Sequence, residues 1–376
     1  MLRWTAAVLA AFLSASLSIS GICAESVTSE PNVAAKYYEA YDMTSEQELI
    51  GKNEKGKMYP ASITKVLFAE VMLERLNEMG KAPDDIAGKV SSADNEKAAS
   101  NGLYRSGLKD GESVSYEDLL HSIIYMSGAE ACYAAVRLTF GNESSAASAM
   151  NKKAESLGMS SSHFVNITGA HNQNHYTTCS DFVKVMRNAW NNSTLKNIFT
   201  TDSYKTTDGK HTFRSPTSRA ASICSGLLIG GKTGTTDPAQ HTFAGYANIK
   251  GHTVIIITAL SPLSISQSNL KDASAVSKFI GDEYELKNIP DSLKSEGYVY
   301  TPVTKGQLLM RKGTLTTKVG NESIVMSSGG QTVVLKAKKS VSDTKTETKK
   351  TKITKRKSGL RAVFEYLRDF LIKIFG

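Results

Sequence analysis

Residues 59–65 of the chain are Tyr59-Pro60-Ala61-Ser62-Ile63-Thr64-Lys65, and a mainly apolar run follows them to Leu73. Proline is favoured in the first turn of a helix, because the N–H that it lacks would have no partner there. We therefore predict a helix that begins near Pro60 and continues to about Met79, with Ser62 and Lys65 on one face. A serine hydroxyl needs a base to act as a nucleophile, and an amine whose pKa is lowered by burial can be that base.

The Ser-x-x-Lys spacing is not specific on its own. It recurs at four other places, where a solvated helix face is the simpler interpretation: Ser106/Lys109, Ser193/Lys196, Ser268/Lys271 and Ser342/Lys345. Two further motifs distinguish the first match. Ser127-Gly128-Ala129 follows a predicted helix, and Lys232-Thr233-Gly234 ends an apolar strand that begins at Leu227.

The three motifs, in this order, resemble those of the penicillin-recognising serine enzymes. Within that group the chain resembles the D-alanyl-D-alanine carboxypeptidases, the low-molecular-mass penicillin-binding proteins of the serine peptidase S11 family. Residues 164–169 (FVNITG) are similar to the family's F-x-N-P-T-G stretch, with Ile167 in place of Pro, and residues 175–181 (HYTTCSD) are similar to its H-Y-S-T-A-x-D stretch. The resemblance implies an α+β fold: an antiparallel sheet flanked by helices plus a helical subdomain, then a small all-β domain and a C-terminal amphipathic helix.

The resemblance also implies a reaction. Ser62 would attack the bond between the two terminal D-alanines of a peptidoglycan stem peptide, with Lys65 as general base. Ser127 would bridge Lys65 and Lys232 and pass the proton to the leaving amine. Water would then hydrolyse the acyl-enzyme, and a β-lactam would acylate the same serine. Such an enzyme acts in cell wall biogenesis and cell shape.

Substrate contacts are implied in the same way. Lys232, Thr233 and Gly234 would hold the terminal carboxylate, a role that suits a cation and a hydroxyl. The backbone N–H groups of Ser62 and Thr235 would form the oxyanion hole. His175 is expected to be a hydrogen-bonding scaffold residue.

One position departs from the family pattern. The second motif ordinarily ends in Asn, and Ala129 occupies that place. A methyl group cannot donate or accept, so an unpaired partner would cost roughly 1–3 kcal/mol. Three alternatives to a carboxypeptidase therefore stay open: a DD-endopeptidase, a DD-transpeptidase on the same scaffold, or a catalytically weak peptidoglycan-binding relative. A β-lactamase is less well supported, since no Glu is placed by motif for deacylation.

The N-terminus predicts export. Residues 1–3 are short and basic, residues 4–22 are apolar and small, and Ala24 ends a plausible cleavage site, so residues 1–24 are interpreted as a signal peptide. An uncleaved anchor helix is the alternative. Three cysteines then remain in the mature chain (Cys132, Cys179 and Cys224). An odd and small number of cysteines does not indicate a disulfide framework. No Cys/His spacing resembles a zinc site, and we expect no metal and no cofactor.

Most of the net charge of +9 comes from one segment. Residues 336–357 carry ten Lys or Arg and two acids, so the rest of the chain is near neutral. This distribution favours an anionic membrane surface over nucleic acid. Residues 358–376 place their apolar side chains on one face of a predicted helix, which we expect to lie on the outer face of the cytoplasmic membrane. Docking of that helix on the protein's own core is the alternative.

The predicted domains are a DD-peptidase catalytic domain at 25–286, a small β domain at 287–336, a basic linker at 337–357 and the anchoring helix at 358–376. Within the catalytic domain we expect helix-like structure at 33–41 and a short strand and turn at 164–169. We also expect a helix capped by Ser180, strands at 242–249 and 253–260, and a closing helix at 270–284.

Overall fold

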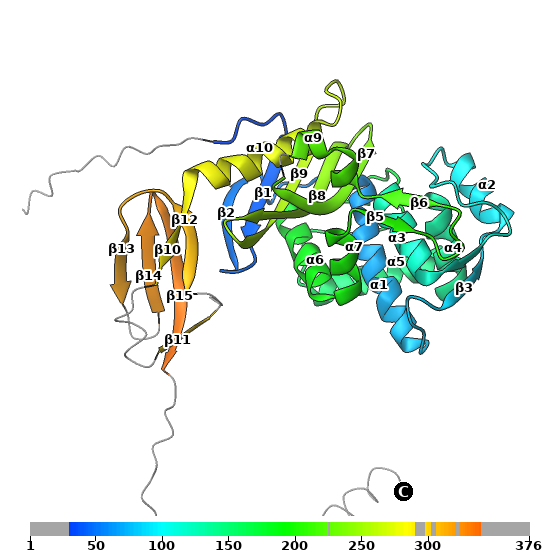
Figure 1. Ribbon diagram of the computed structural model, residues 1–376, viewed down its shortest axis with the longest axis horizontal. Coiled ribbons are helices and arrows are strands. Elements are labelled where there is room, and N and C mark those ends of the chain that lie inside the picture. Colours follow the sequence, from blue (N-terminus) through cyan, green and yellow to red (C-terminus); the bar gives the residue numbers. More distant parts are fainter. Residues whose placement is uncertain (1–29, 225, 290–297, 302–305, 320–322, 340–376) are drawn as a thin grey trace, which may run out of the picture. The chain divides into compact units, whose positions relative to one another are not determined.

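A five-stranded antiparallel sheet, with strand order β2-β1-β9-β8-β7, organises the fold (Figure 1). The computed structural model describes residues 30–224, 226–289, 298–301, 306–319 and 323–339. The sheet consists of β1 (Tyr37–Asp42), β2 (Gln47–Lys52), β7 (Leu228–Thr236), β8 (Gln240–Ile249) and β9 (His252–Ser261). The predicted strands at 242–249 and 253–260 are confirmed as β8 and β9, which form a hairpin.

Both faces of the sheet are buried, as the alternating side chains of β9 illustrate. Side chains alternate between the two faces of a strand. Val254 and Ile256 pack in one core cluster with α10 (Ser268–Glu283), while Ile255 and Ile257 pack in a second cluster with the helices of the opposite face. A continuous apolar run is therefore the signature of this doubly covered strand.

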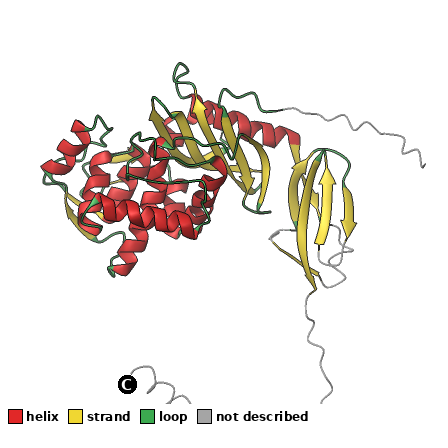
Figure 2. Cartoon of the chain, turned by 180° about the vertical axis from the view of Figure 1, so that it is seen from behind, coloured by secondary structure: helices red, strands yellow, loops and turns green. Residues whose placement is uncertain are grey.

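Most of the remaining helices gather on the face of the sheet opposite α10 (Figure 2), whereas α9 (Ala221–Cys224) packs against α10 in the same core cluster. The central one is α1 (Thr64–Glu78), preceded by the 3₁₀ turn η1 (Ala61–Ile63). The others are α2 (Ser92–Ser100), α3 (Tyr116–His121), the π-helical turn η2 (Ser122–Met126), α4 (Ala129–Thr139), α5 (Glu143–Ser156), α6 (Cys179–Asn191), α7 (Ser193–Thr200) and α8 (Pro216–Arg219). Two short hairpins accompany them, formed by β3 (Ile86–Lys89) with β4 (Ser113–Ser115) and by β5 (Ser203–Lys205) with β6 (Thr212–Arg214).

Two local predictions were wrong, and a third was correct only in part. Residues 37–42 are strand β1 and not helix, because β9 and β2 flank the segment on both sides and its side chains alternate between the two cores. Residues 164–169 contain the predicted turn but no strand. The cap of α6 is Thr178, whose hydroxyl accepts from the Asp181 N–H, rather than Ser180.

Further strands follow α10, as predicted for the later part of the chain. They are β10 (Tyr284–Asn288), β11 (Tyr298–Thr301), β12 (Gln307–Arg311), β13 (Thr316–Val319), β14 (Ser323–Ser328) and β15 (Gln331–Lys339). β10 pairs with β12, and the other four form a sheet of order β11-β15-β14-β13. The described residues before Lys339 belong to one compact unit.

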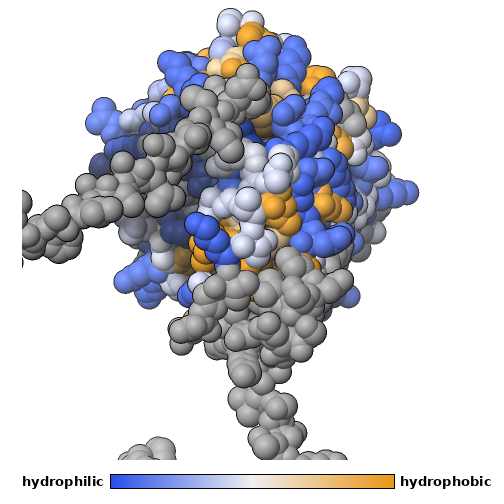
Figure 3. Space-filling view, turned by 90° about the vertical axis from the view of Figure 1, so that its left-hand side faces the viewer, coloured by the Kyte–Doolittle hydropathy of each residue, from blue (hydrophilic) through white to orange (hydrophobic). Residues whose placement is uncertain are grey.

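The predicted signal peptide and C-terminal helix lie outside the described residues. Within the described ranges, no helix is both long and apolar enough to cross a membrane. Hydrophilic residues cover most of the coloured surface in Figure 3, with hydrophobic residues lying between them.

Candidate active site

Ser62 lies in the turn that leads into α1. Pro60 precedes the turn η1, and α1 continues directly from Thr64. Ala61, the residue before Ser62, has a φ of 48°, a left-handed conformation that is unfavourable for any residue with a Cβ atom. Ser62 itself is partly exposed, so a ligand can reach its hydroxyl. Strain of this kind costs about 1–3 kcal/mol and is typical of functional sites.

Two glycines hold the backbone of the nucleophile from either side. A methyl group added to Gly169 would lie 1.9 Å from the Ala61 carbonyl oxygen, and one added to Gly234 would lie 2.8 Å from the Ser62 nitrogen. The turn at 164–169 and the strand β7 therefore both touch the peptide that carries Ser62. Only residues without a Cβ atom permit this approach.

Lys65 lies directly behind Ser62. Its Nζ donates to Ser62 Oγ at 3.1 Å and to the Thr168 carbonyl oxygen at 2.7 Å, and its side chain is 2% exposed. Burial lowers the pKa of Lys65 below its usual value, while the negative charge of Glu130 opposes that shift. An amine in this setting loses its proton more readily than one in water, as a base for Ser62 requires.

Lys232 is a second buried amine, on β7. It is 1% exposed, and its Nζ donates to the Thr233 carbonyl oxygen at 2.8 Å. Burial lowers the pKa of Lys232 well below its usual value, and the charges of Lys65 and Arg219 lower it further. A bound anion would reverse this shift, because an opposite charge favours the protonated amine.

The second motif follows η2 with a strained turn. Ser127 has a φ of 59° and is partly exposed. Among the residues that the structure describes, its hydroxyl makes no hydrogen bond to Lys65 or Lys232, so the predicted bridge stays a proposal. Ala129 is fully buried at the start of α4, and its N–H donates to the Tyr104 carbonyl oxygen at 2.9 Å.

A buried carboxylate follows Ala129. Glu130 Oε1 accepts from Ser106 N at 2.6 Å, from Ser106 Oγ at 2.6 Å and from Gly107 N at 3.0 Å. The Ser106 hydroxyl in turn accepts from Ser122 at 2.7 Å. A methyl group added to Gly128 would lie 2.4 Å from Ser122 Oγ and 3.0 Å from Ser106 Oγ, so this chain of polar groups supports the second motif from behind.

The third motif presents its residues along β7. Thr233 is partly exposed, Gly234 is buried against Ser62, and Thr235 is exposed. The Thr235 hydroxyl donates to the Gly234 carbonyl oxygen at 2.8 Å and lies 2.8 Å from His241 Nδ1. Within the described part of the chain, no group of three or more His, Cys, Asp or Glu residues is placed to hold a metal ion.

His175 joins two parts of the site. Its Nδ1 accepts from the Val165 N–H at 3.1 Å, so its Nε2 carries the proton and donates to Thr64 Oγ1 at 2.8 Å. The ring therefore ties the turn at 164–169 to the first residue of α1. Burial lowers the pKa of His175 to about 4, which keeps the ring neutral at ordinary pH.

This pKa predicts a pH-dependent stability. Between pH 6.5 and about 4 the unfolded chain binds a proton that folded His175 does not, so its stabilising contribution is complete above pH 6.5 and is lost as the pH falls. Denaturant titrations of His175→Asn over this range should show a pH slope smaller by up to about 1.4 kcal/mol per pH unit. An unchanged slope in His175→Asn would contradict the prediction.

The structure adds residues that the sequence motifs did not reveal. They are the Thr168 carbonyl, Glu130 and Arg219, whose guanidinium donates to the Tyr125 carbonyl at 2.8 Å and whose charge acts on Lys232. Glu130 and Arg219 reach the site by tertiary contacts that no local pattern marks. Thr168 lies in the 164–169 stretch, but that stretch did not indicate that its carbonyl accepts from Lys65.

Comparison with known proteins identifies the family. The model of the D-alanyl-D-alanine carboxypeptidase family, Peptidase S11, matches residues 24–260. The D-alanyl-D-alanine carboxypeptidase DacF of Bacillus subtilis is 30% identical over 41% of this chain and 38% of its own length. The D-alanyl-D-alanine carboxypeptidase of Streptomyces sp. strain K15 is 26% identical over 65% of this chain and 87% of its own length. The match to DacF thus spans less than half of that relative.

Solved structures share the fold. The Streptomyces K15 DD-transpeptidase superposes with a TM-score of 0.59 at 25% identity, over 67% of this chain and 98% of that one. A D-alanyl-D-alanine carboxypeptidase from Mycobacterium tuberculosis gives 0.57 at 24% identity, over 67% and 92% of the two chains. The expected penicillin-recognising fold, with an antiparallel sheet and helices, is therefore confirmed. The chain belongs to the D-alanyl-D-alanine carboxypeptidase family of serine peptidases, Peptidase S11.

Proposed function

We propose that the protein is a serine-type D-Ala-D-Ala carboxypeptidase that removes the terminal D-alanine of peptidoglycan stem peptides and is acylated by β-lactams. One observation carries this most directly: the amine of Lys65, itself deeply buried, lies 3.1 Å from the accessible hydroxyl of Ser62. A base within hydrogen-bond reach of a nucleophile is the geometric requirement for covalent catalysis.

The steps follow from this arrangement. Neutral Lys65 takes the proton of Ser62 as the serine oxygen attacks the carbonyl carbon between the two D-alanines. The N–H groups of Ser62 and Thr235 receive the oxyanion. Ser127 relays that proton from Lys65 to the nitrogen of the departing D-alanine. Water then attacks the ester, and Lys65 takes the proton of the water and returns it to the released Ser62 oxygen. The terminal carboxylate is held by Lys232 with Thr233 and Gly234, and its charge restores the proton on Lys232.

The acylation step has a direct test. The full chain is incubated with penicillin and its intact mass is recorded, beside Ser62→Ala. We expect one adduct per chain, located by peptide mapping on Ser62 and absent from the variant, together with D-alanine release from diacetyl-Lys-D-Ala-D-Ala. Folded protein that forms no adduct would remove the proposal and favour a peptidoglycan-binding relative.

A transpeptidase is the second candidate, and the comparisons give it a specific basis. The same Streptomyces K15 protein is named a carboxypeptidase in one comparison and a DD-transpeptidase in the other. Both reactions share the acyl-enzyme and differ only in the acceptor. Adding a D-amino acid or glycine acceptor and measuring exchanged peptide against hydrolysed peptide separates them.

Ala129 does not by itself indicate an inactive protein. Its side chain is buried and its N–H is paired with Tyr104, while Ser62 and Lys65 keep their hydrogen bond. We expect weaker orientation of the substrate amide, and hence slower turnover of peptide, rather than loss of the nucleophile.

The location and domain division are proposals as well. We propose export by residues 1–24 and peripheral attachment to the outer face of the cytoplasmic membrane by residues 358–376. A chain that ends at residue 357 should leave the membrane fraction, and its retention there would contradict the anchor. We also propose the catalytic and small β domains as 25–286 and 287–336, a boundary that falls inside strand β10.

A further inference from the structure

An open cavity of about 770 Å³ lies beside the second motif. One of its lining residues, Tyr104, accepts the hydrogen bond from the N–H of Ala129, two residues after Ser127. The volume falls within the roughly 300–1,000 Å³ that is usual for ligand sites. None of the residues that line this cavity takes part in the mechanism above.

The wall of the cavity is a loop, residues 103–110, held at several points. Glu130 accepts from Ser106 and Gly107 at its inner side, as described above. Asn95 Nδ2 donates to the Leu108 carbonyl at 3.2 Å. The loop therefore has a fixed shape before any ligand arrives, which reduces the entropy lost on binding.

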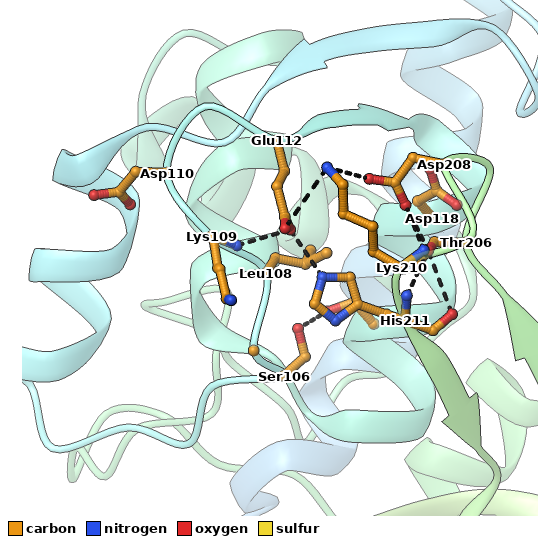
Figure 4. A network of polar contacts seen from close by, with 12 residues as sticks. Ser106, Leu108, Lys109, Asp110, Glu112, Asp118, Thr206, Asp208, Lys210 and His211 are labelled. Carbon is orange, nitrogen blue, oxygen red and sulfur yellow. Dashed lines mark hydrogen bonds and ion pairs between the residues drawn. The ribbon is translucent and has the colours of Figure 1, made fainter.

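A polar network fixes the outer end of this loop (Figure 4). Glu112 Oε2 accepts from the Lys109 N–H at 2.9 Å and lies 2.8 Å from His211 Nε2. Lys210 Nζ lies between Glu112 and Asp208, at 4.0 and 3.0 Å from their carboxylates. Figure 4 shows the Lys109 side chain pointing away from the Glu112 carboxylate that holds its backbone.

Two cations of the cavity wall remain available. Arg105 and Lys109 are both exposed, and neither forms an ion pair with another described residue. Asp110, the one acidic residue of the lining, instead accepts from Asn95 at 2.7 Å. Tyr104, 61% exposed, adds an aromatic surface beside these charges. The lining therefore carries a net positive charge, and the loop that bears it is held beside the second motif by hydrogen bonds.

We propose that this cavity binds the carboxylate-bearing residues that precede the two D-alanines in the substrate, with Arg105 and Lys109 as the recognising groups. This inference rests on the proposed function and specifies its substrate. A guanidinium pairs with a carboxylate through two parallel hydrogen bonds, and an ammonium adds a less directional attraction. Acidic stem peptides would then be preferred over neutral peptides that end in the same D-Ala-D-Ala.

Two peptides test the proposal with the full chain. One is diacetyl-Lys-D-Ala-D-Ala, which has no carboxylate before the cleaved bond. The other is a pentapeptide with an acidic second residue and a carboxylate on the side chain of its third residue. The variants are Arg105→Gln, Lys109→Gln and their combination, with Arg105→Lys to keep the charge. Lys81→Gln removes an exposed lysine that does not line the cavity and serves as the matched control.

The expected result is a loss confined to the acidic peptide. Its kcat/KM should fall about 5- to 20-fold in the double variant, mainly through KM, and the loss should shrink at high salt. The neutral peptide should change less than about two-fold, Arg105→Lys should restore part of the loss, and Lys81→Gln should have no effect.

Other outcomes overturn the inference and not the proposed function. Equal losses for both peptides would mean that the loop only supports the second motif, and no loss for either would mean that the cavity takes no part in binding. If the unmodified protein releases no D-alanine at all, the proposed function fails instead. In that case, calorimetry measures the affinity of each peptide for Ser62→Ala, with and without the Arg105→Gln and Lys109→Gln substitutions. If these two substitutions leave the affinity for the acidic peptide unchanged, the inference about the cavity is rejected.

Discussion

Replacing Lys65 by glutamine is expected to slow penicillin acylation of Ser62 by about 10³-fold, within the range of about 10²–10⁴ that a positioned general base supplies. Lys65 donates to Ser62 Oγ and to the Thr168 carbonyl, and no other amine lies within hydrogen-bond distance of Ser62 in the described part of the chain. Glutamine keeps a donor for the carbonyl but cannot take the serine proton. Stopped-flow or mass-resolved acylation kinetics measure the effect.

The pH profile separates a base from a structural cation. Burial lowers the pKa of Lys65, so acylation of the unmodified protein should rise as the pH increases through that pKa and then level off. Lys65→Arg retains the charge but cannot deprotonate near neutral pH, and its rate should be low and without that rise. Lys184→Gln, which removes a lysine bound to the Gly158 carbonyl away from the site, is the control. Retention of more than a tenth of the rate in Lys65→Gln would mean that another group is the base.

Local sequence patterns predicted much of the fold. Helix α1 follows from Pro60 and the apolar run after it, and it ends at Glu78, one residue before the predicted end at about Met79. Strands β8 and β9 follow from two apolar runs around a short turn. In these elements the residues that specify the structure are neighbours in sequence, so propensity and periodicity agree with the tertiary fold.

The error at β1 shows where that agreement stops. Residues 37–42 carry three tyrosines whose spacing fits either a helix or a strand. The deciding partner is β9, where Tyr38 pairs with Thr258, more than two hundred residues later. No window of local sequence contains that pairing, so tertiary contact overrides the helical interpretation.

The site also combines features that local sequence predicts with features that depend on distant contacts. Ser62 and Lys65 are three residues apart, and their proximity follows from the geometry of a helical turn. The left-handed Ala61 and the supporting carboxylate of Glu130 depend on segments distant in sequence. The Glu130 side chain contacts the Ser106 loop. Its role in holding that loop could be found only from the structure.

Substitution of Gly169 is expected to have the second large effect, on both stability and acylation. Gly169→Ala is expected to destabilise the protein by about 2–4 kcal/mol and to reduce acylation of Ser62 by more than about 100-fold. The new methyl group would lie 1.9 Å from the Ala61 carbonyl oxygen and 2.9 Å from the Ser62 nitrogen, so the peptide before the nucleophile must move. That movement displaces a proposed oxyanion donor, and the loss of one such donor costs about 10²–10³ in rate.

Gly158 supplies a matched control for the strain alone. Gly169 has a φ of 81° and Gly158 a φ of 72°, but a methyl group on Gly158 would meet nothing within 4 Å. Gly158→Ala should therefore lose only about 1–2 kcal/mol, the cost of a left-handed residue with a Cβ atom, and should acylate normally. Denaturant unfolding and acylation rates of the two variants isolate the collision. Similar losses in both would mean that the close approach of Gly169 to the nucleophile contributes nothing beyond its backbone conformation, and the proposed oxyanion hole would lose its main structural support.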